Sequence, residues 1–237
     1  MEDSIAIVYC TKQKSNDGNN GENNPFIMHL KETSECNCHV YAIHNPEGIS
    51  LSKIYSDMMI SADISEKIIV FIHDDIEFLR KGWGKEILRL FNEHQDYGII
   101  GVAGSAQFDA NAAWWNYEKK FGQVLHRADG KSWLTAFSPL LDKDLQEVVV
   151  IDGLFIAVHR ERVKENFSKE LDGFDFYDIY FCLKNHFAEG WKHKIGVTTN
   201  IRIAHNSIGK LKPSWYTNRD IINKEFGKYY PIDILKK

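Results

Sequence analysis

The sequence predicts an α/β fold built on a mixed, mainly parallel sheet flanked by helices. Through the first hundred residues, runs of β-branched and aromatic residues alternate with segments whose apolar residues have helical spacing. This alternation is typical of parallel strands joined by crossover helices. Beyond about residue 105 the alternation is lost. The second half of the chain is therefore expected to be less regular than the first.

The elements of the first half are separated by recognisable turn and capping residues. Pro25 suits the first turn of a helix, and Ser50 suits the N-cap of the next. The polar stretch 12–24 predicts a surface loop. The expected strands are 4–11, 39–44, 67–73 and 97–102, and the expected helices are 25–35, 50–62 and 83–94.

In the second half, residues 105–147 predict long loops with a short hairpin. The apolar run 148–158 predicts one strand, and 197–205 predicts the last strand. A helix is expected over 176–188, because Gly190 stands just past its end. The tail after residue 207 is polar and aromatic and carries no expected element.

The bulk composition excludes several classes of protein. A net charge of −4 over 237 residues gives no basic field for nucleic acid. No apolar run approaches the ~20 residues that span a bilayer, and the start of the chain lacks a signal-peptide pattern. We therefore expect a cytoplasmic protein, for which peripheral contact with a membrane stays open. Cys36 and Cys38 lack a second pair at zinc-finger spacing, and free thiols are the simpler interpretation.

Charged residues follow the most hydrophobic strand of the chain. His73, Asp75 and Glu77 alternate after the apolar run that begins at residue 67, and would share one face of a continuing strand. The carboxyl end of a central strand is where open α/β sheets bind ligands. Carboxylates there could hold Mg²⁺ or Mn²⁺. The alternative is a solvated strand end, or the N-cap of the following helix.

A second acidic site lies at the start of the helix expected over 176–188. Asp178 would fall in the first turn, where the helix dipole stabilises an anion. An ionised carboxylate aimed into a cleft could act as a general base. The alternative is a capping box in which Asp175 is the cap and Asp178 its acidic partner.

Two further positions carry polar groups at the ends or bends of apolar strands. His205 ends a strand, where an imidazole could bind a metal or a diphosphate, or could be an ordinary satisfied polar residue. Asp152 and Gly153 interrupt the apolar run 148–158. They predict either a bend that brings a carboxylate to a ligand or a plain β-bulge.

Five landmarks, taken in order, resemble bacterial glycosyltransferase-like proteins related to glycosyltransferase family 2, which have the GT-A fold. They are Val-Phe-Ile-His73-Asp-Asp75-Ile, Ile151-Asp152-Gly153-Leu-Phe, Phe176-Tyr-Asp178-Ile-Tyr, Gly190-Trp-Lys and Ile203-Ala-His205-Asn-Ser-Ile-Gly209. The resemblance implies a single Rossmann-like GT-A domain over residues 1–237. Residues up to about 104 would bind the nucleotide sugar, and the rest would form an irregular acceptor and catalytic half.

The resemblance also implies a divalent metal, Mn²⁺ or Mg²⁺, held with the diphosphate of the donor. Asp75 matches the last aspartate of the family's D-x-D-type motif, and His73 stands where the first aspartate would be. His205 matches the histidine that completes the metal or diphosphate site. The implied metal ligands are therefore Asp75, His205 and His73.

The implied donor is a nucleotide sugar, usually a UDP-sugar, and the implied acceptor is a saccharide or glycolipid, such as a cell-surface polysaccharide. The residues assigned to the donor are Thr11, Asp74, Asp152 and Gly153. Asp178 matches the catalytic base of inverting members, so we expect inversion in a single displacement.

Two departures from the family pattern keep an alternative open. His73 replaces an aspartate, and Tyr180 replaces an acidic residue that is common two positions after the base. The chain could therefore be a catalytically inactive GT-A-like protein that binds a nucleotide sugar or a glycan. A metal phosphohydrolase of the histidine–aspartate type would require His73 and Asp74 to lie on a helix.

Overall fold

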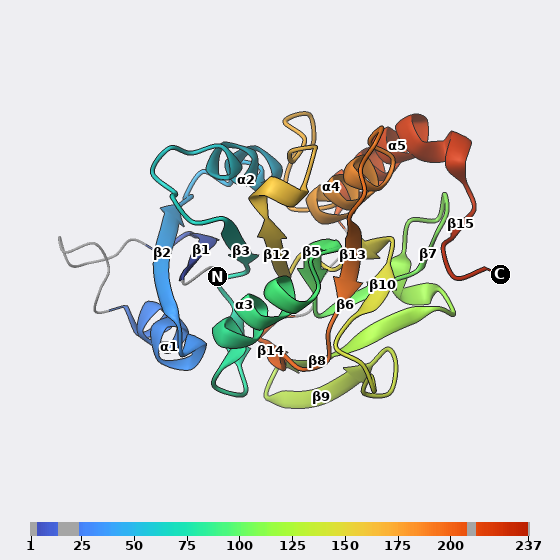
Figure 1. The fold of residues 1–237 in the computed structure, drawn as a ribbon. Coiled ribbons are helices and arrows are strands. Elements are labelled where there is room, and N and C mark those ends of the chain that lie inside the picture. Colours follow the sequence, from blue (N-terminus) through green and yellow to red (C-terminus); the bar gives the residue numbers. More distant parts are fainter. Residues whose placement is uncertain (1–3, 14–23, 208–211, 237) are drawn as a thin grey trace.

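The structure is a computed structural model that describes residues 4–13, 24–207 and 212–236. Its centre is a seven-stranded sheet with the strand order β10-β13-β5-β12-β3-β1-β2 (Figure 1). The strands that share one direction are β1 (Ser4–Thr11), β2 (Asn37–His44), β3 (Ile68–Ile72), β5 (Tyr97–Gly101) and β13 (Lys194–Val197). The two opposed strands are β10 (Gln146–Val148) and β12 (Phe155–His159). The predicted mixed, mainly parallel sheet is confirmed.

Helices cover both faces of this sheet (Figure 1). On one face lie α1 (Pro25–Ser34) and α3 (Trp83–Glu93), and on the other lie α2 (Leu51–Met59) and α4 (Tyr177–His186). Asn24 caps α1 by accepting a 2.8 Å hydrogen bond from the N–H of Phe26. The four predicted helices are thus present. Ser50 precedes α2, but its hydroxyl donates to the carbonyl of Leu171 instead of capping the helix.

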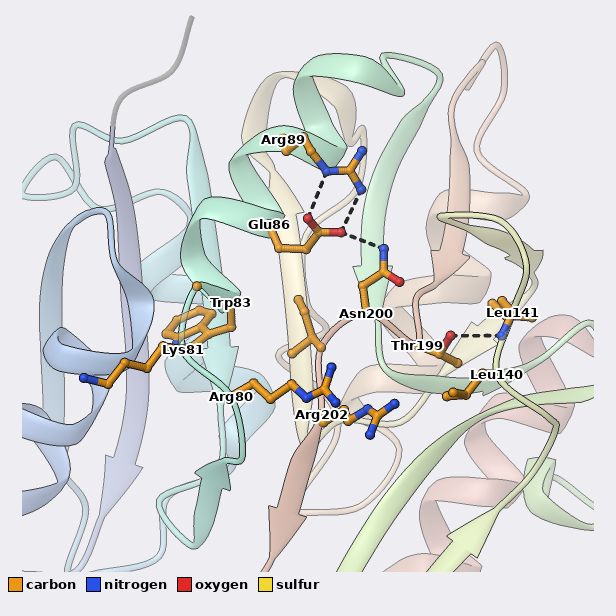
Figure 2. A pocket seen from close by; sticks show the side chains of 12 residues that line it. Arg80, Lys81, Trp83, Glu86, Arg89, Leu140, Leu141, Thr199, Asn200 and Arg202 are labelled. Carbon is orange, nitrogen blue, oxygen red and sulfur yellow. Dashed lines mark hydrogen bonds and ion pairs between the residues drawn. The ribbon is translucent and has the colours of Figure 1, made fainter.

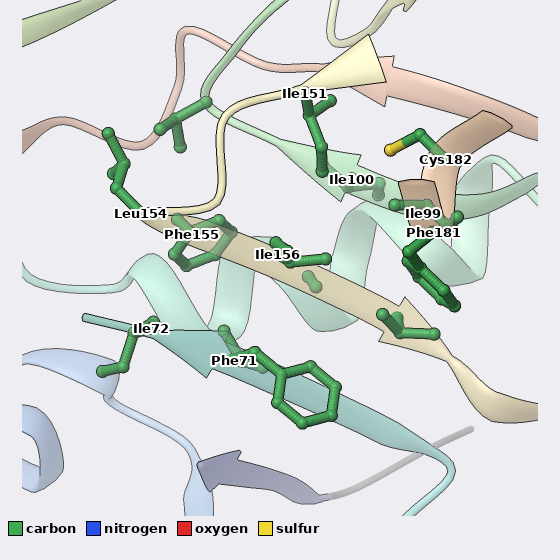
Figure 3. Packing of buried hydrophobic residues seen from close by; sticks show 14 of the residues in the cluster. Phe71, Ile72, Ile99, Ile100, Ile151, Leu154, Phe155, Ile156, Phe181 and Cys182 are labelled. Carbon is green, nitrogen blue, oxygen red and sulfur yellow. The ribbon is translucent and has the colours of Figure 1, made fainter. Parts of the chain in front are cut away.

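The core is continuous through both faces of the sheet. Strands β3, β5 and β12 are buried along their whole length, as expected for strands covered by helices on two sides. Figure 3 shows the packing of Phe71, Ile156 and Phe181 between the sheet and α4. On the α3 face, Phe78 and Trp83 stack with their ring centroids 4.0 Å apart.

A second sheet of six strands lies beside the first and carries much of the irregular half. Its main path runs β11-β6-β8-β14-β4, and β9 pairs with β8. The bounds are β4 (Ile76–Phe78), β6 (Ala103–Ser105), β8 (Lys120–Ala128), β9 (Lys131–Ala136), β11 (Val150–Ile151) and β14 (Ile203–His205). A two-stranded pair joins β7 (Gln107–Phe108) to β15 (Ile232–Asp233).

The prediction of one strand over 148–158 is wrong, because the chain changes sheets there. β10 belongs to the first sheet, β11 to the second and β12 to the first again. The turn between β11 and β12 is made by Asp152, whose carboxylate accepts a 3.0 Å hydrogen bond from the N–H of Leu154. A bend at Asp152-Gly153 was one of the two alternatives predicted for these residues.

The prediction of one strand over 197–205 is wrong for a similar reason. β13 ends at Val197, and a turn leads to β14 in the second sheet. The hydroxyl of Thr198 accepts a 3.2 Å hydrogen bond from the N–H of Asn200, a local bond that competes with continued pairing.

Two elements exceed what was expected. The hairpin of β8 and β9 is longer than predicted, and its turn uses Asp129 and Gly130, which both have positive φ. The tail contains α5 (Pro213–Phe226), whose buried face includes Trp215 and Ile222. Pro213 at the first helical position was an available signal for this helix. The predicted loop 12–24 and Gly209 fall largely or wholly outside the described residues.

Candidate active site

The three predicted metal ligands lie close together where β3 ends. His73 follows β3, Asp75 lies in the turn before β4, and His205 is the last residue of β14. The antiparallel pairing of β14 with β4 places His205 opposite Ile76, next to Asp75 in the chain. One ligand atom from each of these residues lies within 4.8 Å of the others. Residues 130 positions apart in the chain thus form one cluster, which we call the His73–Asp75–His205 cluster.

The two imidazoles approach the same oxygen of Asp75. Nε2 of His205 is 3.2 Å from Oδ1 of Asp75, and Nδ1 of His73 is 3.9 Å from it. That oxygen is buried and has no hydrogen bond of good geometry in the described structure. A buried carboxylate oxygen facing two ring nitrogens fits a divalent cation, so these residues could hold one.

A tyrosine that sequence reasoning missed fixes the tautomer of His73. The hydroxyl of Tyr177 lies 2.8 Å from Nε2 of His73 and donates to the carbonyl of Gly153 at 2.9 Å. Because the hydroxyl proton is used on Gly153, Nε2 of His73 must be the donor of the other bond. The lone pair of His73 is then on Nδ1, the nitrogen that faces Asp75.

Charge within the cluster separates the pKa values of its members. Burial would raise the pKa of Asp75, but the close contact and charge of His205 outweigh it and lower that pKa to about 2. Burial lowers the pKa of His73, and the charge of His205 lowers it further. An ionised Asp75 and a neutral His73 suit metal binding. Burial lowers the pKa of His205, but its contact with Asp75 outweighs burial and raises that pKa, so a metal ion would have to displace a proton from His205.

The expectation that Glu77 shares this site is wrong. The chain turns at Asp74 and Asp75, and Glu77 belongs to β4, where it forms an ion pair with Arg127. Asp74 is exposed, and its charge acts on the side chains of Tyr9 and Cys10 in β1. Because His73 and Asp74 follow a strand and not a helix, the structural condition for a histidine–aspartate phosphohydrolase is not met.

Asp178 lies in the first turn of α4, as predicted, but it does not form a capping box. Phe176 is the N-cap in a left-handed conformation, and no side chain caps the helix. Asp175 instead accepts a 2.6 Å hydrogen bond from Ser214 in α5. The carboxylate of Asp178 is therefore not used to cap the start of α4.

The environment of Asp178 favours its protonated form. Burial, with the charge of Asp152 added, raises the pKa of Asp178 to about 7, although the N–H groups of Ile179 and Gly153 act in the opposite direction. The N–H of Ile179 donates to Oδ1 at 2.8 Å. A carboxylate whose pKa lies near neutrality is suited to accept a proton from a hydroxyl.

Gly153 allows α4 to approach the turn before β12. A Cβ atom at this position would lie 2.2 Å from the hydroxyl of Tyr177 and 3.0 Å from Oδ2 of Asp178. Because Gly153 has no side chain, Tyr177, which orients His73, and Asp178, the predicted base, can both lie against this turn. Asp152, next to it, is close enough to influence the titration of His73 as well as of Asp178.

The second sheet adds two side chains that the sequence did not single out. His126 of β8 pairs in register with His205, and their ring centroids are 5.9 Å apart. Trp133 of β9 stacks on His126 at 5.5 Å and is 38% exposed, whereas Trp114 is buried in the core. The sequence alone did not distinguish the tryptophan that packs in the core from the one that is exposed to a ligand. The Asp129-Gly130 turn was the only local signal for the hairpin that carries Trp133.

Thr11 lies apart from the metal cluster, at the carboxyl end of β1. A cavity of about 390 Å³ opens there between the ends of β1 and β2, and its lining includes Tyr9, Thr11, Tyr41 and His44. The hydroxyl oxygen of Thr11 accepts a 3.2 Å hydrogen bond from the N–H of Gln13. The exposed Asp74, which is next to Asp75 in the chain, acts electrostatically on Tyr9 in the lining of this cavity.

A second group of potential metal ligands does not form a comparable site. Glu93, His94 and Asp144 also have ligand atoms within 4.8 Å of one another. Arg89 occupies their centre, with hydrogen bonds of 2.5 Å to Glu93 and of 2.9 and 3.0 Å to Asp144. The guanidinium of Arg89 thus already donates hydrogen bonds to both carboxylates of this group.

Comparison with known proteins agrees with this fold. The model of a family described as "Glycosyltransferase like family" matches residues 7–226. The chain therefore belongs to this glycosyltransferase-like family. No curated protein matches the chain significantly.

Solved structures that resemble the chain are glycosyltransferases with the GT-A fold. GalNAc-T7, solved with UDP, GalNAc and Mn²⁺, has a TM-score of 0.56 at 9% identity, over 96% of this chain and 50% of that one. TarS 1-349 of S. aureus, in complex with UDP-GlcNAc, has a TM-score of 0.52 at 11% identity, over 94% of this chain and 66% of that one. The chain thus spans half of the GalNAc-T7 chain and slightly less than two thirds of this TarS chain. At these identities the likeness establishes the GT-A fold alone.

No helix in the described ranges is both long and apolar enough to cross a lipid bilayer.

Proposed function

We propose that the chain is a metal-dependent glycosyltransferase that moves a sugar from a nucleotide-sugar donor, a UDP-sugar, to a hydroxyl of a saccharide or glycolipid. The observation that carries the proposal is the convergence of two kinds of group at one end of the parallel strands. A cation-binding cluster of His73, Asp75 and His205 lies beside a carboxylate, Asp178, with a pKa near neutrality. A divalent ion and a general base each assist the transfer of a sugar from a sugar diphosphate.

In this proposal, His73, Asp75 and His205 hold the divalent ion, and Tyr177 keeps His73 in the tautomer that binds it. When bound, the ion supplies positive charge to the departing diphosphate. Two nitrogen ligands and one carboxylate favour Mn²⁺ over Mg²⁺, because Mg²⁺ prefers oxygen ligands alone.

Asp178 takes the proton of the acceptor hydroxyl as that oxygen attacks the anomeric carbon. General-base assistance of this kind contributes about 10²–10⁴-fold in rate. Asp152, whose Oδ1 is bound by the N–H of Leu154, lies beside it and faces the donor sugar. We propose a single displacement with inversion. A retained anomeric configuration in the product would instead assign Asp152 the role of a nucleophile.

The two halves of the chain are proposed to bind different substrates. We propose that residues up to about 104 bind the nucleotide through Thr11, Asp74 and the cavity at the ends of β1 and β2. The later half supplies the base and the acceptor surface. The exposed face of Trp133, one histidine away from His205, is suited to stack on an acceptor sugar ring.

The test combines binding and turnover. Calorimetry with UDP should show binding that depends on Mn²⁺ and is lost in Asp75→Ala. Asp178→Asn should keep this binding and lose transfer by about 10²-fold or more. Asp63→Asn is a matched control, because Asp63 is exposed and its carboxylate has no ion pair within the described part of the chain. Unchanged turnover in Asp178→Asn would remove Asp178 from the mechanism.

One observation favours a second function, that of an inactive nucleotide-sugar-binding protein. Tyr180 stands where an acidic residue is common two positions after the base, and its hydroxyl donates at 2.6 Å to Glu225 of α5. This position is thus used for packing against α5. UDP binding that depends on Mn²⁺, with no product from any saccharide acceptor, would select this second function.

A further inference from the structure

A larger cavity lies at the opposite end of the β4–β14 pair from the metal cluster. It has a volume of about 460 Å³ and is formed by the turn before α3 and by the segment that precedes β14 (Figure 2). Its basic lining residues are Arg80, Lys81, Arg89 and Arg202, and its one acidic lining residue is Glu86. The size is that of a small-molecule site, and the positive charges of Arg80 and Arg202 favour anions.

This cavity is separate from the proposed active site. Arg202 precedes β14 and His205 ends it, so three residues of extended chain, about 10 Å, lie between them. The N–H of Leu79 donates to the carbonyl of Arg202 at 2.9 Å, which continues the strand pairing away from Asp75. None of the proposed metal ligands lines the cavity.

Two of the arginines lack a carboxylate partner. In residues 4–13, 24–207 and 212–236, neither Arg80 nor Arg202 forms an ion pair or a side-chain hydrogen bond, whereas Arg89 is bound by Glu86, Glu93 and Asp144. Figure 2 shows the side chains of Arg80 and Arg202 extending from adjoining segments into the same region, while Lys81 points away. Two like charges that share a cavity are relieved by a bound anion.

The other lining groups suit an anion attached to a less polar body. The hydroxyl oxygen of Thr199 accepts a 3.0 Å hydrogen bond from the N–H of Leu141, which leaves its proton available to a ligand. Leu140 is 52% exposed and contributes an apolar wall. On the opposite wall, Arg89 and Asn200 donate to Glu86, so both oxygens of this carboxylate already have hydrogen-bond donors.

We propose that this cavity binds a phosphate group through Arg80 and Arg202, with the remainder of the phosphate ester against Leu140. Guanidinium groups bind phosphate oxygens with two parallel hydrogen bonds, and a pair of them can hold three oxygens of one phosphate. The phosphate belongs either to a soluble phosphate ester or to an anionic lipid headgroup. The site does not depend on the proposed transferase activity.

The first experiment measures the thermal unfolding midpoint against inorganic phosphate, at constant ionic strength and with EDTA present. The wild type should be stabilised saturably, as expected for a ligand that binds only the folded state. The double variant Arg80→Gln/Arg202→Gln should lose this shift, and each single variant should weaken phosphate binding by roughly tenfold or more. Without phosphate the double variant should unfold no earlier than the wild type, because two like charges that line one cavity are removed.

Two controls separate this site from others. Lys81→Gln removes one positive charge from the same turn, but from a side chain that points away from the cavity, and should keep the phosphate shift. Asp75→Ala should also keep it, since phosphate bound at the metal cluster would respond to this change. A shift of equal size in the double variant, or no shift in the wild type, overturns the proposal.

Vesicle sedimentation then identifies the source of the phosphate. Retention on phosphatidylglycerol vesicles that is absent on phosphatidylcholine vesicles, and absent in the double variant, assigns the site to a lipid headgroup. A phosphate shift without vesicle retention assigns it to a soluble phosphate ester. Vesicle binding that is unchanged in the double variant would exclude the cavity as the lipid site.

Discussion

Replacing Asp178 by asparagine should stabilise the metal-free protein at neutral pH while it abolishes transfer. Folding raises the pKa of this carboxyl from 3.8 to about 7, chiefly through burial and the charge of Asp152. Between these values the folded protein keeps a proton that the unfolded chain has released. The free energy of unfolding of the wild type therefore falls as pH rises through this window. Asparagine carries no charge and escapes this loss.

The magnitude follows from the width of the window. A shift of one pKa unit corresponds to about 1.36 kcal/mol, so the full shift of roughly three units sets an upper limit of about 4 kcal/mol above neutral pH. From about pH 5 to about pH 8, the stability of Asp178→Asn relative to the wild type should rise by about 3 kcal/mol, because the slope acts over the two pH units between pH 5 and the folded pKa near 7. The amide of asparagine must fit against the N–H of Gly153, which reduces the absolute gain but not its dependence on pH.

Urea unfolding in EDTA at about pH 5 and about pH 8 measures this difference directly. Asp63→Asn is the matched control, because it removes an exposed carboxylate and should change stability equally at the two pH values. A stability difference for Asp178→Asn that is the same at both pH values would show that the carboxyl titrates normally. Burial would then not prepare Asp178 as a base.

Three further predictions concern the metal and the acceptor. Asp75→Ala should remove Mn²⁺-dependent UDP binding, measured by calorimetry, and should keep the fold seen by circular dichroism. UDP binding that still depended on Mn²⁺ in this variant would mean that the ion binds elsewhere. Tyr177→Phe should weaken Mn²⁺ binding by about 10–100-fold, because His73 loses the partner that sets its tautomer. Unchanged affinity would refute that role. Trp133→Ala should raise the acceptor KM by about 3–10-fold and leave the donor KM alone, whereas Trp133→Phe should retain most of the stacking. Equal effects on donor and acceptor would argue against an acceptor surface.

Local sequence patterns predicted the helices and strands whose formation depends on residues close to one another in the chain. The strands around Val8 and Val70 were visible as β-branched runs, and Pro25 marked the first helix at the residue where it begins. The helical turn that contains Asp178 was predicted as well. Each of these depends on propensity, capping or periodicity within about a dozen residues, and such information is present in any short window of sequence.

The changes of sheet at Asp152 and after Val197 were not predicted, because an apolar run is equally compatible with one strand or with two strands in different sheets. That choice depends on which partners pair with each segment. β11 pairs with β6, β14 pairs with β4 and β8, and these partners are distant in sequence.

The sequence by itself determined the α/β class, the main helices and the residue types that could bind a metal or accept a proton. Only the tertiary structure decided which of them meet. It turned Glu77 toward Arg127, placed His126 beside His205 with Trp133 stacked on His126, and left Arg80 and Arg202 facing one cavity. The physical reason is that contacts across strands and between sheets depend on register, and register is set by the packing of the whole core.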